Sequence, residues 1–92
     1  MGNITLKTVN LKRERERKEV EEFLNRFELI LERDVEYTLA LFDGERIIGT
    51  GSVSGNVLKC IAIDSDYQGE GLTNKLVSDL LNYQYERNRT RL

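Results

Sequence analysis

The sequence predicts an α/β (α+β) domain with the element order β-α-β-β-β-α and a mixed, mostly antiparallel sheet. Two patterns predict this class. Apolar residues alternate with polar ones in several short segments, as in strands, and recur at helical spacing in two longer segments. A third signal is the Asp43-Gly44 pair between two alternating segments, which indicates a tight hairpin because a type I′ turn needs positive φ at both central residues.

Length and composition limit the classes of protein. The 92 residues suffice for one domain, because a chain of this size buries roughly 60–65% of the surface that it exposes when unfolded. The net charge of -2 lacks the basic excess of a general nucleic-acid binder. No apolar run approaches the roughly 20 residues that span a bilayer, and the N-terminus carries no secretion signal. We therefore expect a cytoplasmic protein with no nucleic-acid or membrane partner.

The first two elements are a strand over residues 4–9 and a helix over residues 11–34. The apolar face of this helix follows the helical period. It comprises Val20, Phe23, Leu24, Phe27 and Leu31. Residues 12–19 hold five basic and three acidic side chains, a mixture that we interpret as a solvated helix end with i,i+4 ion pairs rather than as an interaction surface.

The hairpin strands are expected over residues 35–41 and 47–53. Gly49 and Gly51 lie on one face of the second strand. Glycine at such positions indicates a bulge or a close approach, and either a ligand or a packed helix can make that approach.

The last two elements follow a turn at Gly55-Asn56. Residues 57–63, VLKCIAI, form a nearly continuous apolar run, which predicts a strand buried on both faces. A helix is expected from residue 72 to about residue 87. Its apolar stripe comprises Leu72, Leu76, Val77, Leu80 and Leu81.

Between that strand and that helix lies Gln68-Gly69-Glu70-Gly71. The first turn of a helix has free N–H groups, and the helix dipole adds partial positive charge, so an anion is favoured there. Glycine lets the anion approach the backbone closely. The amides of residues 69–73 would then hold a phosphate or pyrophosphate. The alternative is a helix start that needs glycine for its geometry alone.

The longer stretch IAIDSDYQGEGLTNKLVSDLL resembles the acetyl-CoA-binding motif of the GNAT acetyltransferase superfamily. That motif places x-Pro-x-Tyr-Arg/Gln-Gly-x-Gly-Ile/Leu-Gly/Ala after an apolar strand. The matching residues are Ile63, Tyr67, Gln68, Gly69, Gly71 and Leu72, and Leu76 fits the helix. The departures are Ser65 for proline, Thr73 for a small residue, and the acidic Glu70. The resemblance implies that residues 1–92 are a single truncated GNAT-like domain, the N-terminal half of that fold.

The resemblance also implies a ligand, acetyl-CoA or CoA, and no metal. The residues expected to bind it are Ile61, Ile63, Gln68, Gly69, Glu70, Gly71, Leu72 and Thr73. In this family the pantetheine arm lies beside the strand that precedes the turn. The implied function is acyl transfer from CoA to an amine or thiol acceptor, with the backbone N–H groups of Ile61 and Ile63 as candidates to polarise the carbonyl.

A narrower resemblance joins VLKCIAI and YQGEGLTNKLVSDLLNYQYERNRT to the N-terminal GNAT-like domain of citrate lyase ligases. Those enzymes add a domain that transfers adenylyl groups. They acetylate the thiol of the CoA-like prosthetic group of citrate lyase, using ATP and acetate. The alternative function is therefore a non-catalytic domain that binds CoA or this prosthetic group, and a preference for acetyl-CoA or for dephospho-CoA stays open.

No catalytic residue is assigned. The chain has no histidine, and residues 57–63 contain no carboxylate that could act as a general base. Asp64 is expected to order the turn that follows it. Cys60 is expected to be a buried apolar residue rather than a nucleophile, because no histidine can activate it. Tyr83 and Tyr85 are expected to pack.

The strand over residues 57–63 would lie at the edge of the sheet if nothing follows the last helix. Apolar edge strands pair readily with other chains. We therefore expect a homodimer through that edge or through the uncovered face of the last helix, or else a missing partner domain that covers them.

Overall fold

The computed structural model describes residues 4–55, 57–69 and 71–89. Its elements are β1 (Ile4–Val9), α1 (Glu14–Asn25), β2 (Tyr37–Asp43), β3 (Arg46–Ser54), β4 (Val57–Ile63), the 3-10 helix η1 (Ser65–Tyr67) and α2 (Leu72–Arg89). The predicted class and the predicted order of strands and helices are confirmed. Asn56 of the expected turn and Glu70 of the expected phosphate loop lie outside the described residues.

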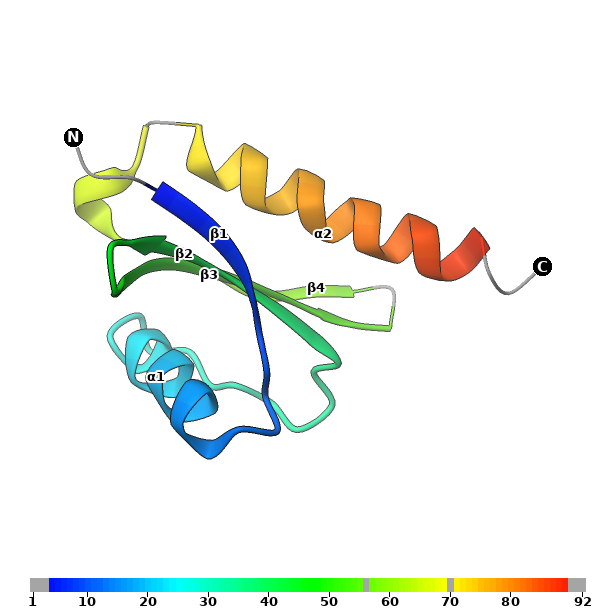
Figure 1. Cartoon of the computed structure of the whole chain (residues 1–92), viewed down its shortest axis with the longest axis horizontal. Coiled ribbons are helices and arrows are strands. Elements are labelled where there is room, and N and C mark those ends of the chain that lie inside the picture. Colours follow the sequence, from blue (N-terminus) through cyan, green and yellow to red (C-terminus); the bar gives the residue numbers. More distant parts are fainter. Residues whose placement is uncertain (1–3, 56, 70, 90–92) are drawn as a thin grey trace.

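The four strands form one sheet in the order β1-β2-β3-β4. All three strand pairings in this described sheet are antiparallel. Helix α1 covers one face and α2 crosses the other, which gives three layers (Figure 1). Neither described helix is both long enough and apolar enough to cross a membrane.

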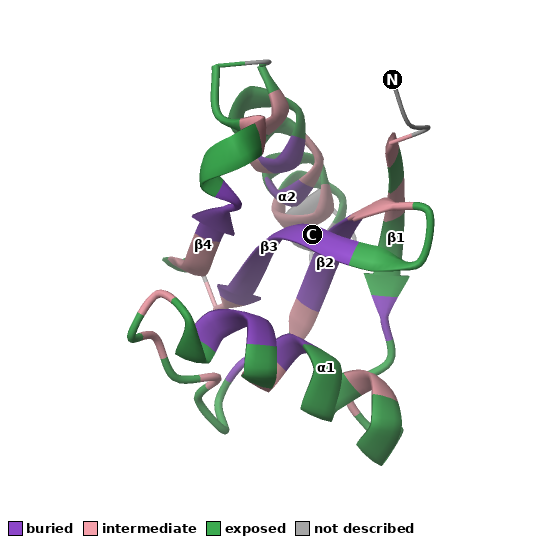
Figure 2. Cartoon of the chain, turned by 90° about the vertical axis from the view of Figure 1, so that its left-hand side faces the viewer, coloured by how far each residue is buried: buried purple, intermediate pink, exposed green. Residues whose placement is uncertain are grey.

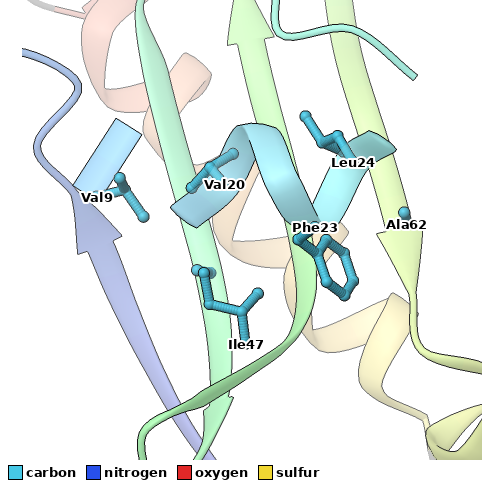
Figure 3. Packing of buried hydrophobic residues seen from close by; sticks show 7 residues of the cluster. Val9, Val20, Phe23, Leu24, Ile47 and Ala62 are labelled. Carbon is cyan, nitrogen blue, oxygen red and sulfur yellow. The ribbon is translucent and has the colours of Figure 1, made fainter. Parts of the chain in front are cut away.

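Each face of the sheet has its own apolar cluster, and burial is concentrated in the central strands and the inner sides of the helices (Figure 2). The α1-side cluster comprises Val9, Val20, Phe23, Leu24, Ala40, Ile47 and Ala62 (Figure 3). The α2-side cluster comprises Leu39, Leu41, Ile48, Val53, Ile63, Leu76 and Leu80. The sheet is therefore buried on both sides, although the chain is short.

Helix α1 ends at Asn25, so the prediction of one helix to residue 34 is wrong. Glu28 has a φ of +59°, and the N–H of Leu29 donates to the carbonyl of Leu24 at 3.0 Å. This is the usual left-handed helix end, but glutamate stands where glycine would signal it. Phe27 and Leu31 still pack against the α1-side cluster, from an irregular segment. The helical spacing of these residues was therefore misleading.

The charged first half of α1 carries the expected i,i+4 ion pairs. Arg15 pairs with Glu19 and Arg17 with Glu21, each at 3.8 Å and each between largely exposed side chains. Such pairs contribute about 0.3–0.5 kcal/mol each. The first half of α1 is therefore a solvated helix end with surface ion pairs, as the sequence predicted.

Strand β4 is the outer strand of the described sheet, and the prediction that it is buried on both faces is wrong. Its last two residues, Ala62 and Ile63, are buried, but Val57 is 54% exposed. An apolar run fits a buried central strand and a partly covered edge strand equally well, because composition alone does not state the position in the sheet.

A β-bulge interrupts β4 at Cys60, whose φ is +55°. Lys59 pairs with Ser52 and Ala62 with Thr50, so two residues of β4 oppose one residue of β3. The extra residue changes which side chains face which helix. As a result Leu58 packs against the α2-side cluster, whereas Cys60, two residues further on, packs against the α1-side cluster.

Helix α2 approaches the sheet closely over Gly51. A Cβ at this position would lie 2.7 Å from Leu80 Cδ1 and 3.2 Å from Leu76 Cγ. At Gly49 a Cβ would lie 2.7 Å from Ile63 Cδ1. Of the two readings that the sequence left open, packed side chains therefore explain these glycines.

Gly51→Val is expected to lower the free energy of unfolding by about 1–3 kcal/mol, because the added methyl groups overpack the contact with Leu80. Leu80→Ala alone should cost about 2–5 kcal/mol. In the double variant the valine occupies part of the space that Leu80 leaves, so the combined loss should be smaller than the sum. Urea unfolding of the three variants measures this, and losses that simply add would show that the two side chains do not compete for space.

Candidate ligand-binding site

The segment Gln68-Gly69-Glu70-Gly71, here called the glycine turn, requires glycine at positions 69 and 71 for its backbone conformation. Gly69 has a φ of +89° and Gly71 a φ of +74°, values that side chains rarely adopt. Both residues are exposed, and nothing lies within 4 Å of the position of a Cβ on either. The conformation explains the glycines, and the same geometry leaves the backbone on this side open to a ligand.

Helix α2 begins directly after the glycine turn. The N–H of Lys75 donates to the carbonyl of Gly71 at 3.2 Å, which closes the first turn of the helix. The N–H groups of Leu72 and Thr73 precede this bond and have no acceptor within the helix. Thr73 is exposed, whereas Leu72 is half-buried against the α2-side cluster. The open backbone donors therefore sit on an anchored helix.

Ile63 offers its backbone rather than its side chain, and Ile61 lies beside the bulge of β4. Both side chains pack toward the α2-side cluster. The N–H of Asp64 donates to the carbonyl of Ile48 in β3 at 2.7 Å, so the N–H of the preceding residue, Ile63, points away from β3. Gln68 Nε2 reaches back and donates to the carbonyl of Ile63 at 3.3 Å.

The seven described residues of the predicted site thus follow one another from the outer edge of β4, through the glycine turn, into the first turn of α2. Ile61 and Ile63 lie on β4, Gln68, Gly69 and Gly71 lie between η1 and α2, and Leu72 and Thr73 begin α2. Glu70 belongs to the same prediction and lies outside the described residues.

Asp64 orders the start of this turn, as expected. Its side chain is 3% exposed, and Oδ1 accepts the N–H of Asp66 at 3.0 Å. Its carbonyl accepts the N–H of Tyr67 at 2.9 Å. The residue therefore caps η1 and fixes the direction in which the chain leaves β4.

Two arginines that the sequence did not single out meet at Asp64. Arg26 and Arg46 each donate from Nη2 to Asp64 Oδ2, at 3.0 Å and 3.2 Å. The N–H of Asp66 and then Arg26 hold the pKa of the Asp64 carboxyl below its usual value. A buried carboxylate at a strand end indicates that a cation must be near. It does not indicate which of the 14 lysines and arginines that cation is.

Tyr67 ties η1 to the hairpin between β2 and β3. Its hydroxyl donates to Asp43 Oδ2 at 2.5 Å, and this bond raises the pKa of Tyr67. The segment between β4 and the glycine turn is therefore held from two directions, by Asp64 and by Tyr67.

A groove of about 470 Å³ lies beside the bulge of β4. It is lined by Glu28, Leu29, Ile30, Glu32, Lys59 and Cys60. The Cys60 thiol donates to the carbonyl of Ile30 at 3.3 Å, and burial raises the pKa of Cys60. The thiol is thus kept protonated at neutral pH, which agrees with a packing role rather than that of a nucleophile, but Cys60 is half-buried and not buried as predicted.

The tyrosines near the end of α2 pack or face solvent. The ring of Tyr83 stacks on that of Tyr37, with centroids 3.8 Å apart, and Tyr85 is 64% exposed. Across residues 4–55, 57–69 and 71–89, no three carboxylate or thiol side chains gather in a way that could hold a metal ion.

Comparisons with known proteins point to one group of enzymes. No family model matches the chain. The chain is 43% identical over 90 residues to a [citrate (pro-3S)-lyase] ligase of Klebsiella pneumoniae and 33% identical over 91 residues to the enzyme of that name from Escherichia coli. The alignments cover 97% and 99% of this chain but 26% of each relative. A third such ligase, from Haemophilus influenzae, is 32% identical over 74 residues. The chain spans about a quarter of the length of these relatives.

Proposed function

We propose that this chain is a domain of a citrate lyase ligase that binds a CoA-type group, either CoA itself or the CoA-like prosthetic group of citrate lyase. The observation that carries the proposal is the open backbone of Gly69 and Gly71, both at positive φ, directly before the N-terminus of α2. The similarity to three enzymes named as ligases of citrate lyase favours this ligand over others.

The phosphate part of the ligand would sit at the glycine turn. Backbone N–H groups at a helix N-terminus attract anions, and Gly69 and Gly71 remove the side chains that would keep a phosphate at a distance. The exposed hydroxyl of Thr73 supplies a further donor at the same place.

The pantetheine arm would follow the outer edge of β4. The backbone N–H of Ile63 faces that edge and matches an extended chain that carries amides. Cys60 lies three residues back along the strand, roughly 10 Å from Ile63. An arm that begins at the turn and follows β4 therefore arrives at the groove beside the bulge.

A binding role is favoured over an independent acetyltransferase. The strand that would present the thioester carries no carboxylate between Val57 and Ile63, and the one thiol on it, that of Cys60, has a raised pKa. A domain that only positions the thiol of a CoA-type ligand needs a complementary surface and backbone hydrogen-bond donors. A domain that catalyses acetyl transfer also needs a group that accepts a proton. The acetyl transfer itself is then the task of the larger ligase.

Calorimetric titration with dephospho-CoA and with acetyl-CoA tests the proposal. Dephospho-CoA is expected to bind, and at least as tightly as acetyl-CoA, because a ligase domain need not recognise the acetyl group. A clear preference for acetyl-CoA would favour an acetyltransferase instead. Failure of both ligands to bind at millimolar concentration would contradict any role of the glycine turn as a phosphate site.

A further inference from the structure

The two glycines of the glycine turn make no side-chain contacts that could fix its position. Gly69 and Gly71 have no side chains, and nothing lies within 4 Å of where a Cβ would be. The position of the turn is therefore set by the segments at its two ends, together with the bond from Gln68 Nε2 to the carbonyl of Ile63. One end is α2, which is anchored by Leu76 and Leu80 in the α2-side cluster. The other end is η1.

The η1 end depends on the carboxylate of Asp64. One oxygen accepts the N–H of Asp66, and the other accepts both arginines, Arg26 from the end of α1 and Arg46 from the start of β3. The backbone N–H of Asp64 also bonds to Ile48 in β3. Asp64 thus fixes η1, which leads into the turn, against two elements that are distant in sequence, α1 and β3.

We propose that Asp64, held by Arg26 and Arg46, is the positioning residue of the glycine turn and sets its affinity for the phosphate part of a CoA-type ligand without touching that ligand. The inference rests on the proposed function. Backbone donors bind an anion well only when they are held within a fraction of an ångström of the right geometry. Three charge-assisted bonds on one buried carboxylate provide such a hold.

The discriminating variant is Asp64→Asn. Its amide oxygen still accepts the N–H of Asp66, but the negative charge that holds the two arginines is gone. Affinity for dephospho-CoA, measured well below the unfolding midpoint, is expected to fall roughly tenfold or more. In the ligand-free chain, hydrogen exchange should become faster at the hydrogen-bonded amides of Asp66 and Tyr67 and stay unchanged in β2 and β3.

Glu21→Gln is the matched control. Glu21 is also an ion-paired carboxylate, bonded to Arg17, but it lies on the surface of α1 and is not among the residues of the proposed site. The control variant is expected to bind dephospho-CoA as the original chain does and to keep the exchange rates of the Asp66 and Tyr67 amides.

Three outcomes would overturn the inference: unchanged affinity in Asp64→Asn, unchanged exchange at the Asp66 and Tyr67 amides, or faster exchange spread over the whole sheet. If the original chain itself does not bind dephospho-CoA, the proposed function is wrong, and the exchange measurement still decides whether Asp64 positions the turn. If Asp64→Asn does not fold, Arg46→Gln replaces it. That variant keeps the carboxylate and Arg26 but removes one of the two cations that hold Asp64, and it carries the same expectations at a smaller size.

Discussion

Gly71→Asp is expected to remove most of the binding of dephospho-CoA. The new carboxylate would lie among the backbone donors where the phosphate is proposed to sit, and aspartate tolerates the positive φ of this position better than most side chains. Two like charges about 4 Å apart repel by about 1–4 kcal/mol, depending on how well water screens them. Affinity should therefore fall roughly ten- to a thousand-fold in a calorimetric titration.

Two control variants separate the charge from other effects of the change. Gly71→Asn has nearly the same shape without the charge and should keep most of the affinity. Gly55→Asp adds the same carboxylate at another open glycine with positive φ, +60°, beyond the other end of β4, and should bind normally. Equal loss in Gly71→Asp and Gly71→Asn would mean that shape matters and that no phosphate sits at this turn.

Removing both arginines from Asp64 should have the largest effect on stability among changes to polar residues. Arg26→Gln combined with Arg46→Gln leaves a buried carboxylate without a cation. Breaking a fully buried ion pair costs about 3–5 kcal/mol. Because both arginine side chains are half-exposed and screened by water, we expect the free energy of unfolding at neutral pH to fall by only about 2–3 kcal/mol. The matched control, Arg15→Gln with Arg17→Gln, removes two surface pairs and should change stability by less than about 1 kcal/mol.

The pH dependence of unfolding gives this prediction a second readout. The pKa of Asp64 is lower in the folded chain than in the unfolded one, so the unfolded chain binds the proton more readily. The resulting stability is present above the unfolded pKa, about 3.9, and is lost as the pH falls through the folded pKa. The difference between the original chain and the double arginine variant should therefore shrink below about pH 4. A difference that is the same at neutral and acidic pH would show that the arginines do not act through Asp64.

Local signals predicted most of the elements, and their failures have physical causes. Alternation and the Asp43-Gly44 turn placed the strands of the hairpin correctly to within two residues. The end of α1 was missed because Glu28 adopts a left-handed conformation, which a glutamate in the sequence does not predict. In addition, Phe27 and Leu31 continue the helical spacing although they lie outside the helix. Such an end is decided by packing of the later residues against the sheet, which no local window contains.

The sequence predicted the position and the backbone conformation of the candidate site, but not the side chains that hold it in place. Glycines between a strand and a helix are visible in any sequence, and Gly69 and Gly71 do adopt positive φ. The arginines that meet at Asp64 come from 38 and 18 residues away in the chain, and their approach depends on how α1 and β3 are placed. A motif therefore locates the turn, whereas the groups that hold it emerge only from the tertiary structure.

The order of the strands in the sheet repeats their order in the chain. β2, β3 and β4 form a meander in which each connection is two residues long, residues 44–45 and 55–56. Closing such short loops costs little chain entropy, and topologies rich in local contacts fold quickly. β1 pairs with β2 across residues 10–36, so the slower loop closure falls on the N-terminal strand. We therefore expect β4 to pair with β3 early in folding, as part of the β2-β3-β4 meander, and before β1 joins the sheet.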